Sequence, residues 1–446
     1  MRPNITSAPV PLPLYVHHPQ AREYQKMSQL LDAHPETEEM VLKDLLHELK
    51  EPGQGRSGMS ARQVLRVLLV KQTRQLSYQD LAFYVADSVT CCLFCGFDSP
   101  TAVPQKSAMQ DNLARVREAT LEQINRVVLQ EAVEQKVESG QQTRTDCTVV
   151  EAPIHKPTDS SLLWDGVRRL TLVLNWASTK GYEVAAIDRT TEAKRAALEI
   201  SYAANDEERR PLYEKLLGLA WETSWSAQEG AETLERYLGD QRAQGAALKL
   251  RQGVELLARV IDQTQRRVLE GKKVPAEQKV LSLAEWHTDL IVKDRQDSQF
   301  GHKVCLTFGA SSLVLDCKVL VGNPADVTLT VPMMKRHKET YGKAPQRATF
   351  DGAFTSRENL QVLKGMGVKQ IAFSKRRGIP IEEMCSSKAV YRRLRRFRAG
   401  AEGCISFLKR TMGLRRCLWK GPQGFCAYVW GSVLAANLLL LARHLL

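Results

Sequence analysis

The hydrophobic pattern of residues 24–135 is almost entirely helical, because apolar residues recur at intervals of three and four. Three sequences in this stretch are typical of helix N-termini: Ser60-x-x-Gln63, Ser77-x-x-Asp80 and Thr120-x-x-Gln123. The first two predict a helix, a short turn and a second helix.

The first of these two helices carries basic residues outside its apolar face. Val64, Leu65 and Leu68 share that face, whereas Arg62 and Arg66 lie largely on others. A helix, a turn and a second helix with basic outer residues are compatible with a helix-turn-helix DNA reader. A purely structural or dimerising helical pair has the same pattern, so Arg62 and Arg66 are candidate DNA contacts only.

The pattern changes at residue 143. Residues 145–150 are rich in β-branched side chains and predict a strand. Residues 303–308 and 312–321, separated by Gly309-Ala-Ser, predict a β-hairpin. Two more strands are predicted at residues 347–351 and 369–374, and helices begin near Gly322–Asp326 and at Ser356. A hairpin followed by alternating helices and strands predicts an α/β fold with a mixed sheet flanked by helices.

Residues 187–285 return to a helical pattern. An apolar stripe with alternating steps of four and three is formed by Leu250, Val254, Leu257, Ile261, Thr264 and Val268. Because the stripe spans only about two and a half heptads, it favours an antiparallel helical hairpin over a long coiled coil. This pattern predicts an all-α insertion after the first strand.

The composition narrows the class of partner. The chain of 446 residues carries 63 Lys and Arg against 50 Asp and Glu, a net charge of +13, and its pI is about 9.2. Its ordinary globular composition excludes collagen, a disordered chain and a polytopic membrane protein. The basic balance favours a polyanion as partner, nucleic acid before a membrane surface.

Cysteine usage and the first residues indicate the compartment. Residues 1–16 have no continuous apolar core, so they do not resemble an export signal. The ten cysteines are therefore expected to be reduced, in the cytoplasm. Cys92-x-x-Cys95 has no second ligand pair nearby, which favours packing over zinc binding.

Residues 425–442 contain no charge and are of borderline length for a membrane span. Ser432, Asn437 and two glycines dilute their apolar character. A buried terminal helix that closes a core is the favoured interpretation.

Three acids form the candidate chemistry. Asp146 lies inside the first strand, where a buried carboxylate is costly unless a cation neutralises it. Asp351 ends a later strand. Glu402 shares one helical face with Arg395, Arg398 and Lys409, and it is the only acid among twelve Lys and Arg between residues 388 and 446. From spacing alone, Glu402 fits either a metal ligand or a salt-bridge partner of Arg398.

At these residues the sequence resembles the RNase H-like DDE transposases of bacterial insertion sequences, in the branch around the IS-five and ISNCY-type groups. The resemblance covers nearly the whole chain, and five blocks carry it in addition to the helical N-terminal region. These are Thr145-Asp146-Cys-Thr-Val-Val-Glu151 with Pro157-Thr158-Asp159, Gly301-His302-Lys303, Gly322-Asn323-Pro324-x-Asp326, Phe350-Asp351-Gly352, and Arg398-(3)-Glu402-(6)-Lys409. The last block is similar to three of the four members of the family's Y-R-E-K signature, and Arg395 stands where the pattern expects tyrosine, with Tyr391 one turn earlier.

The resemblance implies a domain organisation and an RNase H-like catalytic fold. A Pro-rich arm (residues 1–26) precedes a helical N-terminal domain that would bind DNA ends (27–140). The catalytic domain comprises residues 141–186 and 298–446, and the helical insertion comprises residues 187–297.

The resemblance also implies the chemistry. Asp146, Asp351 and Glu402 are the expected catalytic acids and ligands of two Mg²⁺ ions, for which Mn²⁺ can substitute. The expected DNA contacts are Arg395, Arg398, Lys409 and Arg410, together with Arg62 and Arg66, and the possible accessory residues are His155 and His302. The expected activity is cleavage and strand transfer of element ends by a homodimer assembled on DNA in the nucleoid. A domesticated DNA-binding protein that no longer cuts, or a related Mg²⁺-dependent nuclease, remains an alternative.

Overall fold

The computed structural model describes residues 12, 16–47, 58–292 and 298–446. Most of the predicted Pro-rich arm therefore lies outside the described residues. The chain divides into two compact units, of which the first comprises residues 1–151 and 302–446 and the second residues 152–301.

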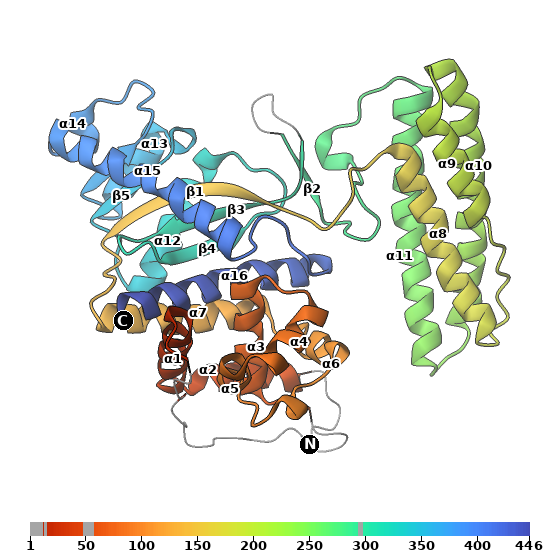
Figure 1. The fold of residues 1–446 in the computed structure, drawn as a ribbon. Coiled ribbons are helices and arrows are strands. Elements are labelled where there is room, and N and C mark those ends of the chain that lie inside the picture. Colours follow the sequence, from red (N-terminus) through yellow and green to blue (C-terminus); the bar gives the residue numbers. More distant parts are fainter. Residues whose placement is uncertain (1–11, 13–15, 48–57, 293–297) are drawn as a thin grey trace. The chain divides into compact units, whose positions relative to one another are not determined.

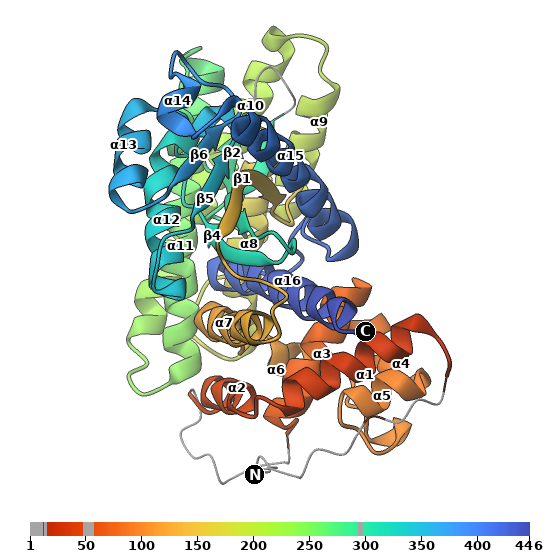
Figure 2. The same ribbon diagram turned by 90° about the vertical axis from the view of Figure 1, so that its left-hand side faces the viewer.

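The first unit is built on a mixed sheet (Figures 1 and 2). Its strands are β1 (Gln142–Glu151), β3 (Gln299–Phe308), β4 (Val314–Val319), β5 (Arg347–Phe350) and β6 (Gln370–Phe373), in the order β3-β1-β5-β6 with β4 beside β3. β1, β5 and β6 are parallel, whereas β3 and β4 form the antiparallel hairpin. The predicted strands and the mixed sheet are thus confirmed. The three-residue β2 (Asp289–Ile291), which pairs with the start of β3, is too short to show alternation in the sequence.

Helices of the catalytic part pack on this sheet. α15 (Lys388–Thr411) lies against β1, β5 and β6, as both ribbon views show (Figures 1 and 2). α12 (Thr330–Tyr341) packs against α13 (Arg357–Gly365) and β4, and the short α14 (Ile381–Met384) precedes α15. Apolar side chains of α12, β5 and β6 share one buried cluster.

The N-terminal region is helical, as the periodicity predicts. Its helices are α1 (Pro19–Asp32), α2 (Glu36–Leu46), α3 (Ala61–Arg74), α4 (Tyr78–Asp87), α5 (Val89–Phe94), α6 (Lys106–Leu113) and α7 (Glu118–Glu134). Ser60 and Gln63 form the predicted capping box, and Ser77 caps α4. The third predicted N-terminus is wrong, because α7 begins at Glu118 and Thr120 is already inside it.

The charge-free C-terminal segment is a core helix, α16 (Gly421–His444). It is long and apolar enough to cross a membrane, but 89% of its most apolar window is buried inside the protein. It packs against α1, α3 and α7 on one side and reaches β4 on another. Asn437 lies in this interior and is satisfied there, because its side chain bonds Asn125 and both main-chain groups of Val314.

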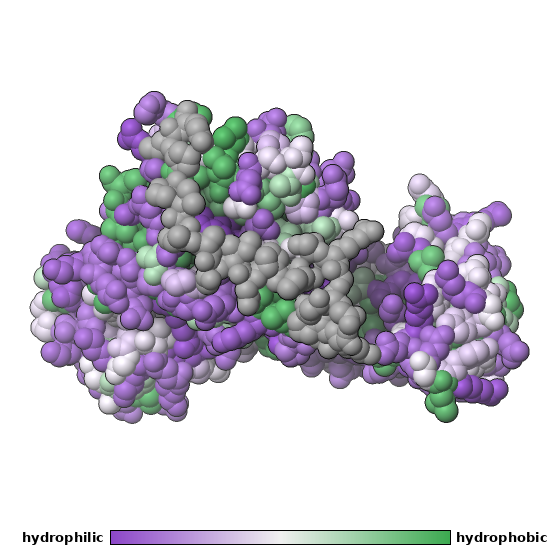
Figure 3. Space-filling model, turned by 90° about the horizontal axis from the view of Figure 1, so that it is seen from below, coloured by the Kyte–Doolittle hydropathy of each residue, from purple (hydrophilic) through white to green (hydrophobic). Residues whose placement is uncertain are grey.

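The second unit is a helical bundle of α8 (Asp159–Thr179), α9 (Thr190–Tyr202), α10 (Asp206–Glu235) and α11 (Gln241–Thr264). α10 and α11, joined by a short loop, form the predicted hairpin, and Leu250, Leu257 and Ile261 of the stripe are buried. The bundle begins earlier than the predicted residue 187, because α8 packs against α10 and α11. Its exposed surface is mostly hydrophilic where Figure 3 shows it.

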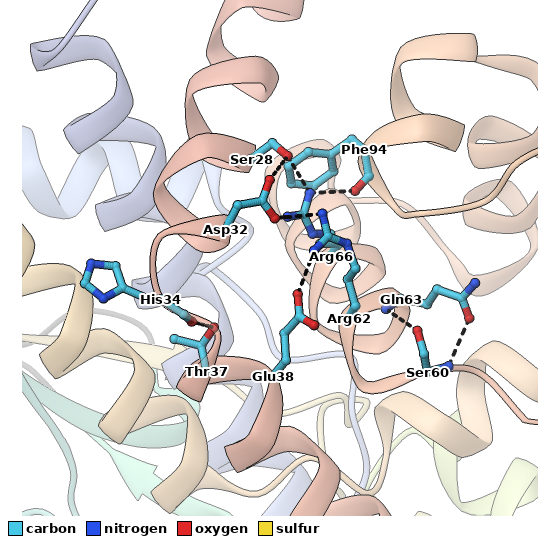
Figure 4. A network of polar contacts seen from close by, with 10 residues as sticks. All are labelled: Ser28, Asp32, His34, Thr37, Glu38, Ser60, Arg62, Gln63, Arg66 and Phe94. Carbon is cyan, nitrogen blue, oxygen red and sulfur yellow. Dashed lines mark hydrogen bonds and ion pairs between the residues drawn. The ribbon is translucent and has the colours of Figure 1, made fainter. Parts of the chain in front are cut away.

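Arg66 does not lie on the outer face of its helix. The side chain of Arg66 is 1% exposed, and its guanidinium contacts Asp32 at 2.6 Å, Ser28 at 2.7 Å and the carbonyl of Phe94 at 3.0 Å (Figure 4). Burial, followed by the charge of Arg62, lowers the pKa of Arg66 to about 10. A guanidinium buried and paired in this way is not available to a phosphate in this structure, which argues against the predicted DNA contact at Arg66.

Arg62 also forms ion pairs with acids of the N-terminal helices. Its guanidinium pairs with Asp32 at 2.7 Å and Glu38 at 3.2 Å (Figure 4). The following helix, α4, contains Asp80 and Asp87 and no Lys or Arg, so it lacks the charge of a helix that approaches DNA. The α3–α4 pair therefore matches the structural alternative better than the helix-turn-helix reader.

Arg66→Met should lower the free energy of unfolding by about 3 kcal/mol, because it leaves buried partners of the guanidinium unpaired. Arg62→Met, at a more accessible position that shares Asp32, should cost less. Urea unfolding of both variants measures this. Unchanged stability of Arg66→Met together with weaker DNA binding would instead restore Arg66 as a DNA contact.

Candidate active site

Two of the predicted acids are brought together by strand register. In the parallel pairing of β1 with β5, Thr145 lies opposite Phe350. The residue after each of these is an aspartate, Asp146 within β1 and Asp351 directly after β5, so the two acids follow the same registered pair. Neighbouring parallel strands lie about 4.8 Å apart, which places the two carboxylates side by side at this level of the sheet.

The third acid comes from α15, which is anchored to the sheet on its apolar face. Ser387 caps the helix, and the buried Tyr391 donates a hydrogen bond of 2.8 Å to the carbonyl of Phe373 in β6. Leu394 and Ala401 continue the buried face. Tyr391 therefore anchors α15 to β6, and this anchor holds Arg398 and Glu402 in position over the sheet.

All three acids pair with one guanidinium. Nη2 of Arg398 lies 2.7 Å from Asp146 and 3.4 Å from Asp351, and Nη1 lies 3.3 Å from Glu402. The side chain of Arg398 is 13% exposed, whereas that of Glu402 is 75% exposed. The carboxylates of β1, of the residue after β5 and of α15 therefore surround one cation.

Asp351 is held in its ionised form. Partial burial favours the neutral acid, but the Ser374 hydroxyl at 2.8 Å, the N–H groups of Gly352 and Ala353, and Arg398 together lower the pKa of Asp351. Asp146 accepts a hydrogen bond of 2.8 Å from the N–H of Cys147. Both aspartates are therefore oriented by groups that favour a carboxylate.

The donor set suits a hard divalent cation, since it consists of three carboxylates without sulfur or nitrogen. In this conformation Arg398 is their common cation, and within the described residues no group of three or more His, Cys, Asp or Glu is arranged to hold a metal ion. Cys92 and Cys95 are buried within and beside α5.

Comparison with protein families then decides the class. Residues 255–438 match the family described as a transposase DDE domain, and residues 13–115 match a transposase domain (DUF772). The chain is a DDE transposase of an insertion sequence. Neither match distinguishes the branch, and searches of curated proteins and of solved structures found no match. The DDE match contains Asp351 and Glu402, and Asp146 precedes it.

The positive charge of the transposase is concentrated in its C-terminal part. Residues 302–446 contain 25 Lys and Arg against 8 Asp and Glu, a net charge of +17. Residues 1–151 have a net charge of −3 (16 against 19), and residues 152–301 one of −1 (22 against 23). A polyanion would therefore be attracted to the part that carries Asp351 and Glu402.

Exposed cations line this part of the transposase. Arg395 and Arg410 are exposed on α15, and Lys409 is partly buried. Sequence reasoning missed Lys375, Arg376 and Arg377, which are exposed directly after β6. Their signal was a basic triplet at a strand end. The stem of Lys375 packs on Gly352, where an added β-carbon would lie 2.6 Å from Cβ of Lys375, so this lysine is adjacent to Asp351.

The contacts described for the two histidines are with groups other than the three acids at Arg398. His302 is buried and its ring packs edge-on against Phe425, at 4.7 Å between centroids. His155 belongs to the second unit, where it lies 3.8 Å from the carboxylate of Asp165. An accessory role for either histidine stays a prediction.

Ser374→Ala should lower the free energy of unfolding by about 1 kcal/mol at pH 6, because ionised Asp351 loses a hydrogen bond. The folded pKa of Asp351 lies below the ordinary value of about 3.9. The stability that this hydrogen bond contributes is therefore fully present above about pH 3.9, the ordinary pKa, and is lost as the pH falls through the folded pKa of Asp351. Urea unfolding in chelator, from pH 6 toward pH 3, should show the deficit shrinking.

Ser356→Ala is the matched control, because Ser356 caps α13 through the N–H of Asn359, a bond that does not titrate. Its deficit should be nearly independent of pH. The same pH dependence in both variants would contradict the role given to Ser374.

Proposed function

We propose that this transposase cuts DNA at the ends of its insertion sequence and joins those ends to target DNA, with Asp146, Asp351 and Glu402 as its catalytic acids. The observation that supports this is the meeting of the three carboxylates, from separate parts of the chain, at Arg398. Gathered like charges are costly for folding, so such a cluster is typical of a functional site.

The three carboxylates would hold two Mg²⁺ or Mn²⁺ ions. When bound, such ions activate the attacking water or 3′-hydroxyl and stabilise the leaving oxygen of an in-line displacement. The protein's own part is to keep the donors charged and oriented. Cys147 and Ser374 do this for the two aspartates, and α15 does it for Glu402.

Arg398 has a separate part in this proposal. It offsets the repulsion among the three carboxylates, and as a forked donor it also suits a DNA phosphate. Arg395, Lys409 and Arg410, on the same helix, would contact further phosphates of the DNA backbone. The homodimer expected on DNA would work in the cytoplasm, where bacterial DNA lies.

Glu402→Gln tests the catalytic assignment. The amide keeps the shape of the side chain but removes the charge, so Mg²⁺-dependent cleavage of element ends should fall by orders of magnitude. Binding to the ends should persist or tighten, because one carboxylate near phosphate is removed. Cleavage and gel-shift assays on element-end DNA measure both.

The matched control is Glu383→Gln, since Glu383 is a surface acid paired with Arg357 at 3.7 Å. It should leave cleavage unchanged. If Glu402 were only a salt-bridge partner of Arg398, its variant would behave like this control, at a cost of about 1 kcal/mol or less in stability. Wild-type binding without cleavage would favour the domesticated DNA-binding protein, and cleavage without joining the nuclease.

Arg395→Ala and Arg410→Ala test the DNA surface. Each should weaken binding to all DNA sequences and reduce the slope of log K against log salt by about one for each phosphate that the protein no longer neutralises. Arg195→Ala, at an exposed cation of α9 paired with Glu199, is the control. Salt slopes equal to wild type in the α15 variants would show that these cations do not contact phosphate.

A further inference from the structure

Arg144 is a buried cation for which the described part of the chain provides no counter-ion. It lies on β1 two residues before Asp146, so the two side chains leave the strand on the same face. The residue is 7% exposed, and among the described residues no carboxylate pairs with it. Its Nε has no hydrogen-bond partner in the described structure either. A buried charge of this kind is costly, and an apolar side chain would avoid the cost.

The guanidinium of Arg144 joins three elements. Nη1 donates to the carbonyl of Phe397 at 3.1 Å, and Nη2 donates to Ser312 Oγ at 2.8 Å and to Cys404 Sγ at 3.0 Å. It also lies 4.6 Å from the ring centroid of Phe397. Ser312, in the β3–β4 turn, has a φ of 71°, a left-handed conformation that is costly for serine.

The residues of α15 that Arg144 contacts lie on either side of the helix turn from Arg398 to Glu402. Phe397 immediately precedes Arg398, and Glu402 lies between Gly400 and Cys404. A β-carbon at Gly400 would collide with Nη1 of Arg144, so this glycine permits the close approach of helix and guanidinium.

Apolar packing covers only part of this stretch of α15. A cavity of about 400 Å³ lies beside Arg144, and its lining includes Phe407, Leu440 and Phe308. Because the pocket leaves this side of the helix partly uncovered, the hydrogen bonds from Arg144 add a direct connection between β1 and the α15 turn, beside the ion pair of Arg398 with Asp146.

We infer that Arg144 is a positioning residue, which holds the α15 turn so that Glu402 and Arg398 face Asp146. This rests on the proposed function of the three acids. Arg144 would touch neither metal nor DNA and would act through Glu402. Its forked donors reach separate acceptors at once, which a lysine cannot do in the same geometry.

Gly400→Ala tests the inference without changing any charge. The methyl group displaces the guanidinium, so Mn²⁺ affinity, measured by titration calorimetry and electron paramagnetic resonance, should fall by about tenfold, as when groups that orient metal ligands are removed. Arg144→Met should show the same fall, and Arg144→Lys should not rescue it. DNA binding in chelator, to which we expect Arg395 and Arg410 also to contribute, should change much less.

Gly403→Ala is the matched control, because a β-carbon there meets nothing within 4 Å. Both alanines raise helix propensity similarly, so the difference between them reports the contact with Arg144. In the Glu402→Gln background, Gly400→Ala should cause no further decrease of Mn²⁺ affinity, a result that general unfolding would not produce.

Two results separate this inference from the proposed function. Wild-type Mn²⁺ affinity in Gly400→Ala, in a protein whose affinity depends on Glu402, would overturn the positioning role and leave the three-acid site intact. Mn²⁺ binding that does not depend on Glu402 in wild type would overturn both.

Discussion

The electrostatic balance around Arg398 is the constraint on which the candidate site depends. Two like charges 4 Å apart repel by about 4 kcal/mol at an effective dielectric constant of 20. Three carboxylates gathered without a cation would therefore oppose folding strongly. The guanidinium of Arg398 contacts all three, and the surrounding structure delivers the acids to it through the β1–β5 register and the anchoring of α15 by Tyr391.

The distribution of charge separates the roles of the regions. The N-terminal helices carry a small negative charge and bury Arg66, whereas residues 302–446 have a net charge of +17. The charge that attracts a polyanion is therefore carried mainly by the segment that contains α15. We expect DNA affinity to follow that segment, with the N-terminal helices packed on α16 as support.

Much of the fold follows from local pattern. Alternation and turn residues locate β1, the β3–β4 hairpin, β5 and β6, and the apolar stripe locates α11, because these signals need only neighbouring residues. The three acids and Arg398 were likewise named from strand position, helical spacing and family resemblance. Their assignment as metal ligands stays a proposal. β2 and the basic loop after β6 were missed, because both are short segments with little periodicity.

The sequence by itself determined most of the elements, the mixed sheet and the basic character of the C-terminal part. Only the tertiary structure decided which charges are inside. Nothing in the neighbouring sequence indicates that Arg66 and Arg144 are buried. Helical or strand spacing identifies the apolar face of an element, but it does not show which segments pack against the other face. Asp146 and Arg398, 252 residues apart, meet because parallel strands and an overlying helix bring them together. Periodicity indicates the secondary structure in which a residue lies. Ion pairing depends on groups from distant parts of the chain, which come within reach only when the chain packs.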